Sequence, residues 1–494
     1  MHLIDFVIFL VFTLGIVVFG CSFFRRDSSA YEFTSADHSI PGWVVGMSIF
    51  ATYVSSISYI GYPGKAFASN WNAFVFSLSI PIASFFAARY FVPFYRHSGS
   101  VSAYTFLEEK FGAWARLYAS ACYLLTQIAR MGSILYLLAV PMYILMGWDL
   151  HAVIILTSVG IIIYSMMGGL KAVIWADAIQ GIILIGGALL CLAILMFSMP
   201  GGPVQTFELA IHAPGGNKFS LGAFSSDLTT STFWVCIVYG VFINLQNYGI
   251  DQNYVQRYHV AKSDRDARFS ALFGGYLFIP VSALFFLIGS ALYSYYTAGV
   301  AELPADIAAK PDYVFPYFIV NGLPVGLRGL LIASIFAAGM STVSTSVTSA
   351  ATIILTDYWK PLTRAVPRRE RPSDLAVLRI SSVVVGVLGI VVAIAMLSVE
   401  SIIDAWWTLS SIFSGGMLGL FLLGCIPQRI NRWAALAGCV CGVAVIAWIS
   451  LADLWGLPGI HLHSYLAIVL GTTAIFLVGF LFTWLLRNVQ KISW

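Results

Sequence analysis

The sequence predicts an all-α polytopic membrane protein, and three observations carry the prediction. Hydrophobic residues make up 59% of the 494 residues. Charged residues make up only 10%, whereas a soluble domain needs roughly a quarter of its residues charged to cover its surface. Apolar runs long enough to cross the ~30 Å hydrocarbon core of a bilayer recur along the whole chain. This composition excludes a soluble enzyme or binding domain.

We count thirteen apolar runs and expect each to form one membrane-spanning helix, about 13 in all. The first run has no basic residue before it and is followed by Arg25 and Arg26, so we interpret it as a retained helix and not as a cleaved signal peptide. The runs cover residues 3–23, 42–66, 72–95, 115–146, 151–168, 172–199, 231–256, 268–297, 327–356, 376–398, 402–425, 433–452 and 464–487.

The basic residues predict the orientation of the chain, because cytoplasmic loops carry an excess of Lys and Arg. With the N-terminus outside and the C-terminus in the cytoplasm, the clusters Arg257 to Arg268 and Lys360 to Arg379 fall in cytoplasmic loops. The net charge of +4 then reflects topology, and no nucleic acid is expected as a partner. The short loops are typical of a bacterial inner-membrane protein. We expect the lipid bilayer and a small-molecule solute as partners and no obligatory protein partner.

Two of the ionisable residues inside predicted spans stand out, because a charge inside the membrane costs ~2.5–3.5 kcal/mol to insert. Arg130, in "YLLTQIARMGSILYLL", lies too deep to reach either interface easily. Its guanidinium matches a carboxylate bidentately and so predicts an anionic substrate; the alternative is a structural Arg paired with a carbonyl or an acid on a neighbouring helix. Asp177 is a candidate cation ligand or proton acceptor. Pairing with Lys171 is its alternative, although a spacing of six residues puts the two on opposite faces of a helix.

Hydroxyl side chains crowd into the ninth run, "IFAAGMSTVSTSVTSA". One or two could bond back to their own helix, but so many favour a cation site. Sodium takes about five or six oxygen ligands, from hydroxyls and from carbonyls that broken helices leave free. At 100° per residue Ala338, Ser341, Thr342 and Thr345 share one face, with Ser344 beside Ser341. The hydroxyl residues are Ser341, Thr342, Ser344, Thr345, Ser346, Thr348 and Ser349.

Two other runs contain residues that weaken a helix, and they lie five spans apart, the offset of a five-plus-five inverted repeat. Interrupted spans at corresponding positions of two halves indicate a transporter's binding site. The second run contains Ser55, Ser56, Ser58, Gly61, Pro63 and Gly64. The seventh run contains Gly240, Asn244, Gln246, Asn247 and Gly249.

These motifs resemble the sodium:solute symporter family along nearly the whole chain, and within it the bacterial sodium/sialic acid transporters. The carrying motifs are "GWVVGMSIFATYVSSIS", "PGKAFASNW", "YSMMGGLKAVIWADAIQG", "DQNYVQRY" and "IFAAGMSTVSTS". The resemblance implies a LeuT-type core of two inverted five-helix repeats in a single transmembrane transporter domain. The expected division is an extra N-terminal helix and loop in 1–40, the repeats in 41–228 and 229–428, and two C-terminal helices in 429–494.

The resemblance also implies one or two sites for Na⁺ as the coupling ion. The first would use the carbonyls of Ala51, Val54 and Ala338 with the hydroxyls of Ser341 and Thr342. The second, present in only part of the family, would use Asp177 with Ser341, Ser344 and Thr345.

On the substrate side the resemblance implies a carboxylate clamp made of Arg130, Ser55 and Ser58. Two neighbouring positions depart from the sialic acid branch: Tyr53 stands where a Thr is expected, and Ser77 stands where a Gln contacts the sugar. Further candidates to line the pocket, from the seventh run, are Phe242, Asn244 and Gln246; for Phe242 the alternative is a core aromatic.

The sequence therefore predicts a sodium-coupled secondary active symporter that imports a small organic solute by alternating access. A carboxylated sugar such as sialic acid is expected, and a neutral sugar or a monocarboxylate is the alternative. An enzyme is not expected: an intramembrane serine protease needs a base, and none of the eight histidines lies in the interior of a predicted span, His151 being the first residue of its run. A channel would need a repeated filter or a ring of charge, and a transporter-like sensor would need a signalling domain.

Overall fold

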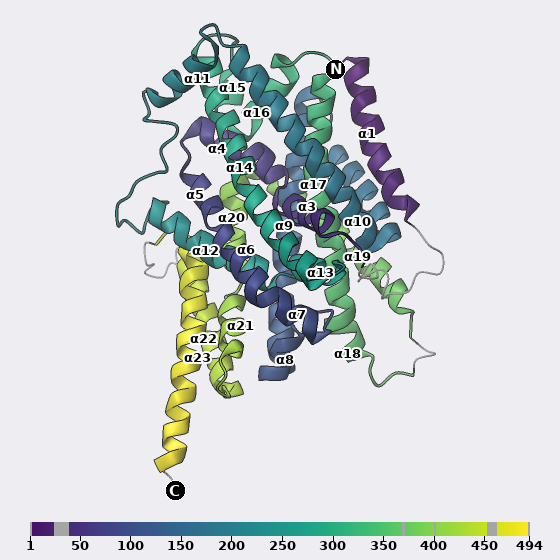
Figure 1. Cartoon of the computed structure of the whole chain (residues 1–494), viewed down its shortest axis with the longest axis vertical. Helices are drawn as coiled ribbons and strands as arrows, with labels where there is room; N and C mark the ends of the chain where they lie inside the picture. The colour runs from purple at the N-terminus through teal and green to yellow at the C-terminus, as the bar shows by residue number, and fades with distance from the viewer. Residues whose placement is uncertain (1, 24–38, 368–370, 400–401, 452–461, 493–494) are drawn as a thin grey trace.

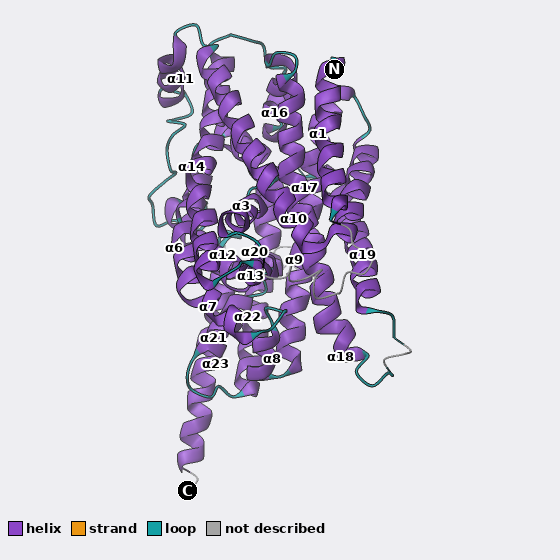
Figure 2. Cartoon of the chain, turned by 45° about the vertical axis from the view of Figure 1, so that its right-hand side comes forward, coloured by secondary structure: helices purple, strands orange, loops and turns teal. Residues whose placement is uncertain are grey.

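The computed structural model describes residues 2–23, 39–367, 371–399, 402–451 and 462–492. These residues form helices joined by loops (Figure 2), with one isolated β-bridge between Ile40 and Ala261. The described residues are thus all-α, as the sequence predicts. Arg25 and Arg26, which bear on the predicted orientation, lie outside the described residues.

Ten helical stretches among the described residues are long and apolar enough to cross a membrane. Several contain short π or 3₁₀ turns, so a stretch can comprise more than one named helix. The stretches are α1 Leu3–Ser22, Asn72–Ser98 with α5 Val75–Leu78, α6 Ile80–Phe86 and α7 Val92–Ser98, the larger part of α9 Ala113–Met146, the second part of α10 Leu150–Phe197, α12 Phe233–Ile250, α14 Asp264–Thr297, α17 Leu327–Ile353 with α18 Lys360–Leu362, α19 Asp374–Ala395, α22 Arg432–Leu451 and α23 Leu466–Ile492.

Two bent pairs also pass the length and composition test together, each at a break of a few residues. They are α3 Gly42–Tyr53 with Ile57–Ala68, which contains α4 Tyr62–Ala68, and α20 Ile402–Phe413 with α21 Met417–Cys425. The remaining predicted run, 151–168, corresponds to the shorter apolar helix Leu150–Ile163. Connecting helices are α8 Thr105–Phe111, α11 Gly202–Ile211, α13 Gln252–Val260, α15 Ala305–Ala308 and α16 Pro311–Gly322.

The fifth and sixth predicted runs are two helices that meet at a sharp kink at Gly169, and together they make up α10. The backbone of Gly169 has φ 60° and ψ −165°, a conformation that only glycine adopts without strain. The kink separates the first part of α10 from its second part, Gly169–Phe197. The two apolar runs are therefore two helices, as predicted, and Gly169 makes the turn between them.

The second predicted run is a broken helix. Helix α3 ends at Tyr53, Val54 is extended with φ −79° and ψ 112°, and the chain resumes at Ile57 after a bend of 58°. The seventh run also breaks, but at Asp251, which is extended with φ −75° and ψ 125°. The Asp251 side chain caps the following helix α13 by accepting a hydrogen bond from the Asn253 amide. Both predicted interruptions exist.

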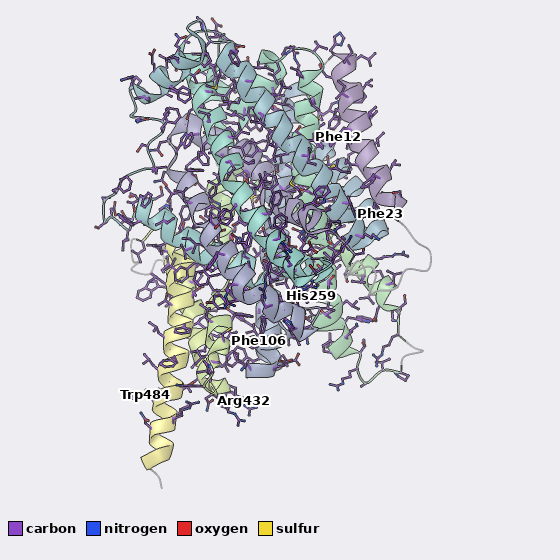
Figure 3. The ribbon with its side chains drawn as sticks, in the orientation of Figure 1. Phe12, Phe23, Phe106, His259, Arg432 and Trp484 are labelled. Atoms are coloured by element: carbon purple, nitrogen blue, oxygen red, sulfur yellow. The ribbon has the colours of Figure 1, made fainter. Side chains whose placement is uncertain are left out.

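Helix α17 lies at the centre of the bundle, and 94% of the most apolar 18 residues of the stretch Leu327–Leu362 are buried. It packs against α1, α3, α9, α10 and α19. The two chain ends lie at opposite ends of the molecule in Figure 1, with α11, α15 and α16 near the N-terminal end and α18 toward the other. Figure 3 places Arg432 and Trp484 at the C-terminal end, residue types that are common at a membrane interface.

Candidate functional site

The hydroxyl face of α17 meets the broken end of α3. The Ser341 hydroxyl donates to the Ala51 carbonyl at 3.1 Å and to the Ala338 carbonyl at 3.0 Å. The Thr342 hydroxyl lies 3.5 Å from the Thr52 carbonyl and 3.2 Å from that of Ala338. All of these residues are buried. Four of the five residues predicted for the first sodium site thus lie together, and the fifth, Val54, is in the adjacent break.

The other hydroxyls of α17 have different partners. Ser346 donates to Gln127 of α9 and Ser349 to Gln256 of α13, at 2.8 and 2.9 Å. Ser344 and Thr348 donate back to carbonyls of their own helix. Six of the seven hydroxyls therefore divide into contacts with α3, contacts with α9 and α13, and bonds within the helix.

Asp177 is fully buried and forms an ion pair with Arg257, whose Nη2 lies 2.8 Å from the Asp177 Oδ2. The same Nη2 donates to the Thr345 hydroxyl at 2.7 Å, and Nε donates to Ser48 at 2.8 Å. Ser48 also donates to the Asp177 carboxylate at 2.6 Å. Asp177 and Thr345 of the predicted second sodium site are thus joined through a guanidinium, whereas the Ser344 hydroxyl donates to the Ser341 carbonyl of α17.

Arg257 is the clearest departure from the sequence prediction. We expected it in a cytoplasmic loop at the start of a basic cluster, but it is fully buried in α13. Its other terminal nitrogen donates to the Asn253 carbonyl at 2.7 Å. The physical reason is that the chain does not enter a loop after the seventh run. It continues beyond the break at Asp251 as the buried helix α13, which contains Arg257, so the loop and its basic residues begin only after α13 ends.

A pocket lies beside the break in α3 and encloses about 590 Å³ of space including its open mouth. Arg130 of α9 lines it and donates from Nη2 to the Thr52 carbonyl at 2.5 Å. The guanidinium therefore rests on the broken end of α3, as the structural alternative for Arg130 requires, and also faces the pocket, as the ligand interpretation requires. The lining residues are Tyr53, Ser55, Ile57, Ser58, Tyr62, Phe76, Thr126, Gln127, Arg130, Tyr239, Ile243, Asn247, Asp251, Trp406, Trp407 and Ser410.

The first broken helix brings its predicted residues to the pocket. Tyr53, Ser55 and Ser58 all line it with Arg130. The Tyr53 hydroxyl accepts a hydrogen bond from Asn247 at 3.2 Å, and its ring stacks on Tyr248 with a centroid separation of 5.8 Å. The Tyr that replaces the expected Thr thus packs into the core and presents one face to the pocket.

Four other predicted residues are not among those that line the pocket. Ser77 is fully buried and pairs with the Ser282 hydroxyl at 2.7 Å. Asn244 donates to the Ser79 hydroxyl at 2.8 Å. Gln246 is buried in α12, and Phe242 packs against a core cluster, as its alternative interpretation expects.

The pocket face of α12 instead carries Tyr239, Ile243 and Asn247, which are spaced four residues apart and so share one face of the helix. Phe242, Asn244 and Gln246 are each offset by one residue from that set, which turns them away. The sequence indicated which helix lines the pocket, whereas the residues chosen by polarity lie beside the lining face in this conformation.

The sequence analysis missed several polar residues of the pocket. Thr126 and Gln127 precede Arg130 by four and three residues, so helical spacing alone could have placed them on its face. Gln127 donates to Asp251 at 3.2 Å and accepts from Asn253 at 3.0 Å. A buried polar network therefore links the pocket floor to the second break.

Aromatic rings form one wall of the pocket. Trp407 lies 5.1 Å from Phe76 and 5.7 Å from Tyr239 between ring centroids. Pockets for small molecules commonly combine such apolar walls with a few polar groups that fix the orientation of the ligand. Nothing in the sequence around Trp406 and Trp407 indicated this role, because aromatic residues recur throughout apolar spans.

Comparison with known proteins gives the family. Residues 33–442 match the model of the sodium:solute symporter family. The sodium/sialic acid symporter NanT of Aliivibrio fischeri is 32% identical, over 96% of this chain and 92% of that protein. The corresponding symporter SiaT of Proteus mirabilis is 32% identical, over 99% and 97%. Sodium-coupled monocarboxylate transporter 2 of Mus musculus is 27% identical, over 91% and 72%.

Solved structures give the fold. A Na⁺-coupled sialic acid symporter in a substrate-bound outward-open state superposes with a TM-score of 0.89 at 30% identity, with 98% of each chain covered. Mhp1, a nucleobase-cation-symport-1 family transporter, has a TM-score of 0.59 at 14% identity, with 95% of this chain and 96% of that chain covered. The predicted LeuT-type fold, Na⁺ coupling and absence of an enzyme activity agree with these matches. The chain belongs to the sodium:solute symporter family and is a sodium-coupled solute symporter.

Proposed function

We propose that this symporter imports a carboxylated sugar of the sialic acid class, driven by Na⁺ and by alternating access. The observation that carries the proposal is a shared group: the Thr52 carbonyl lies 2.5 Å from the Arg130 guanidinium and 3.5 Å from the Thr342 hydroxyl. One peptide at the broken end of α3 thus contacts both a candidate anion clamp and a candidate sodium site.

The first sodium site is assigned to the carbonyls of Ala51, Val54 and Ala338 and the hydroxyls of Ser341 and Thr342. These five groups offer oxygen donors, which a hard cation prefers. The buried hydroxyls of α17 can turn their lone pairs toward an ion that lies between them and the carbonyls they now contact. An ion held there joins α3 to α17.

Coupling follows from this position. Sodium that joins the end of α3 to α17 fixes the segment on which Arg130 rests, so it stabilises the conformation in which the clamp is formed. Loss of the ion to a sodium-poor cytoplasm reverses the effect and releases the substrate. Each ion contributes its concentration gradient and ~2.3 kcal/mol per 100 mV of membrane potential.

The substrate class is inferred from the pocket and from the relatives. Arg130 offers a bidentate partner for a carboxylate, with Ser55 and Ser58 as hydroxyl donors beside it. Asn247 and the aromatic wall suit the polar groups and the carbon skeleton of a sugar. Two relatives that match nearly the whole chain are named as sodium/sialic acid symporters. A monocarboxylate, the alternative substrate, would contact the same carboxylate clamp and fewer of the aromatic side chains.

A second sodium ion at Asp177 requires a rearrangement. In the conformation described, the cation beside Asp177 is Arg257 at 2.8 Å. The guanidinium holds Oδ2 of Asp177 and the Thr345 hydroxyl, while Oδ1 of Asp177 is buried without a hydrogen-bond partner, so we infer that sodium joins Asp177, Ser341, Ser344 and Thr345 once the guanidinium moves away. We therefore assign one sodium to this conformation and a second to a state in which α13 has shifted.

The membrane placement follows the same reasoning. A bacterial inner membrane, an outer N-terminus and a cytoplasmic C-terminus are supported by the predicted charge distribution and by the position of the two termini at opposite ends of the molecule (Figure 1). The inverted repeats are assigned to 41–228 and 229–428, each of which begins with a broken helix.

Ligand binding by the purified protein tests the proposal. Calorimetry in NaCl or choline chloride would compare N-acetylneuraminate, its neutral methyl ester, glucose and lactate. We expect the acid to bind in sodium only, and the ester at least about tenfold more weakly, because it loses the charge-assisted pairing with Arg130. Equal binding of acid and ester would overturn the carboxylate clamp, and stronger binding of lactate would favour the monocarboxylate alternative.

A further inference from the structure

A second hollow lies away from the substrate pocket, between α1, the first part of α10, the end of α9 and α17. It encloses about 1170 Å³ including its open side. Its lining is apolar apart from Thr13 and Thr157. Leu10, Leu14 and Leu156 line it and are also exposed on the surface of the bundle. The hollow is therefore a groove that opens sideways, where these spans would face the lipid.

The length of the groove fits one leaflet of a bilayer. On α1 its lining extends from Phe6 to Val17, a distance of about 16 Å at the rise of an α-helix. Half of the ~30 Å hydrocarbon core is about 15 Å. A single acyl chain that enters from one membrane surface would fill the groove to its end.

One end of the groove has the character of a membrane interface. An adjoining hollow of about 560 Å³ is lined by Trp148, Asp149, Ala152, Val153 and Leu156, and it shares Trp148, Val153 and Leu156 with the groove. Tryptophan is enriched where the hydrocarbon meets the headgroups. Asp149 is well exposed and lies 3.4 Å from His151. The polar end of an amphiphile would therefore lie at this loop.

The charge at that end indicates the headgroup. Asp149 is the one Asp, Glu, Lys or Arg between residues 131 and 170, and residues 1–24 contain Asp5 and neither Lys nor Arg. The Arg328 side chain of α17, near Asp5, donates to the Leu323 carbonyl. Asp5 is buried and accepts hydrogen bonds from the Gly326 and Gly329 amides. An exposed carboxylate attracts an ammonium and repels a headgroup with a net negative charge.

We propose that this groove binds a phospholipid with an ammonium headgroup, such as phosphatidylethanolamine, with one acyl chain between α1 and α10. The floor of the groove includes Phe336 and Met340 of α17, and Met340 directly precedes Ser341. The Phe336 ring contacts Phe9 of α1, with 4.8 Å between centroids. The acyl chain thus supports the back of the helix whose other face carries the sodium hydroxyls, a consequence that rests on the proposed sodium site.

Gly160 allows a direct test, because a Cβ at this position of the groove meets no other atom within 4 Å. Gly160→Leu places an apolar side chain in the groove from a Cβ that has room. Gly186→Leu is the matched control, since it also adds a side chain into open space on α10 but lies outside the groove. The full chain would be reconstituted with phosphatidylethanolamine that carries a photoactivatable acyl chain, and the labelled peptides would be mapped by mass spectrometry.

We expect labelling of the peptides from α1 and the first part of α10, reduced at least about fivefold by Gly160→Leu and unchanged by Gly186→Leu. Labelling that Gly160→Leu does not reduce would overturn the site. Equal labelling by photoactivatable phosphatidylglycerol would overturn the headgroup assignment. Thermal unfolding of both variants separates a filled groove from a misfolded chain.

The half-saturating Na⁺ concentration for ligand binding provides a second readout. It should shift at least about threefold in Gly160→Leu and remain unchanged in Gly186→Leu. If the native protein shows no sodium-dependent binding, the proposed function fails, yet the labelling experiment still decides the lipid site. If labelling is lost and the sodium dependence does not change, the lipid binds without acting on α17.

Discussion

At the scale of single residues, the Thr52 carbonyl is where ion and substrate binding meet. It accepts from Arg130 and lies within reach of Thr342. A backbone carbonyl oxygen has two lone pairs, so it can accept a hydrogen bond from the guanidinium on one side and lie beside the sodium site on the other. The break after Tyr53 places this carbonyl at the end of α3.

Thr342→Val should weaken sodium binding while keeping the shape of the side chain. Loss of one hydroxyl ligand in a buried site costs about 1–3 kcal/mol, so the half-saturating Na⁺ concentration should rise roughly tenfold. Thr348→Val is the control, because the Thr348 hydroxyl bonds to carbonyls of its own helix. Equal effects of the two substitutions, measured by sodium titration of ligand binding, would remove Thr342 from the site.

Arg130→Lys separates charge from geometry. Lysine keeps the positive charge but loses the planar fork that binds both carboxylate oxygens. We expect the Kd for the carboxylated ligand to rise at least about tenfold, and the preference for the acid over its methyl ester to decrease without disappearing. Calorimetry at saturating Na⁺ measures both. An unchanged Kd would mean that Arg130 serves only to hold the end of α3.

Asp177 and Arg257 should depend on each other for stability. Removal of one partner from a buried ion pair costs about 3–5 kcal/mol, because the other charge remains buried and unpaired. Asp177→Asn and Arg257→Gln should each lower the thermal midpoint, and the double variant should recover part of the loss. Asp374→Asn is the control, since its pair with Lys360 is about half exposed and such pairs contribute little. Additive losses in the double variant would contradict the pairing.

At the scale of helices, the broken elements depend on close contact with their neighbours. A Cβ on Gly289 of α14 would lie 2.3 Å from the Pro63 carbonyl oxygen and 2.7 Å from the Ala66 Cβ. Glycine therefore lets α14 lie directly against α4. This contact supports the second half of the first broken helix beside the substrate pocket.

Gly289→Ala should push α14 away from α4. Overpacking of this kind costs about 1–3 kcal/mol, so the thermal midpoint should decrease and ligand affinity should decrease with it. Gly186→Ala is the control, because a Cβ at Gly186 meets nothing within 4 Å. Differential scanning fluorimetry compares the two variants. A Gly289→Ala protein as stable as the native one would show that the helices adjust freely.

The sequence predicted where the helices lie better than it predicted which of their residues are buried or line the pocket. Length and apolarity located the spans, because the bilayer imposes both on any helix that crosses it. The second break was expected near Gly240 to Gly249, but it occurs at Asp251, where a carboxylate caps the next helix. Arg130 and Asp177 stood out as charges in apolar runs, whereas Arg257 did not, because its burial depends on the path of α13 after that break.

At the scale of the whole molecule, two broken helices and α17 form one functional unit. α3 with α4 and α12 with α13 both line the pocket or its supporting network, and α17 packs against α3 and α13. A movement of either half relative to the other therefore alters the ion site and the pocket together. Tertiary contacts of this kind, such as the Trp407 wall, could not be read from local sequence patterns.

The central claim is that a sodium gradient drives uptake of a carboxylated sugar through the Arg130 pocket. Uptake of labelled N-acetylneuraminate into proteoliposomes, with an imposed inward Na⁺ gradient or a matched K⁺ gradient, tests it most directly. We predict accumulation with Na⁺ only, and its loss in Arg130→Ala. Absence of uptake of the acid, with sodium-driven uptake of a neutral sugar by both native protein and Arg130→Ala, would contradict it.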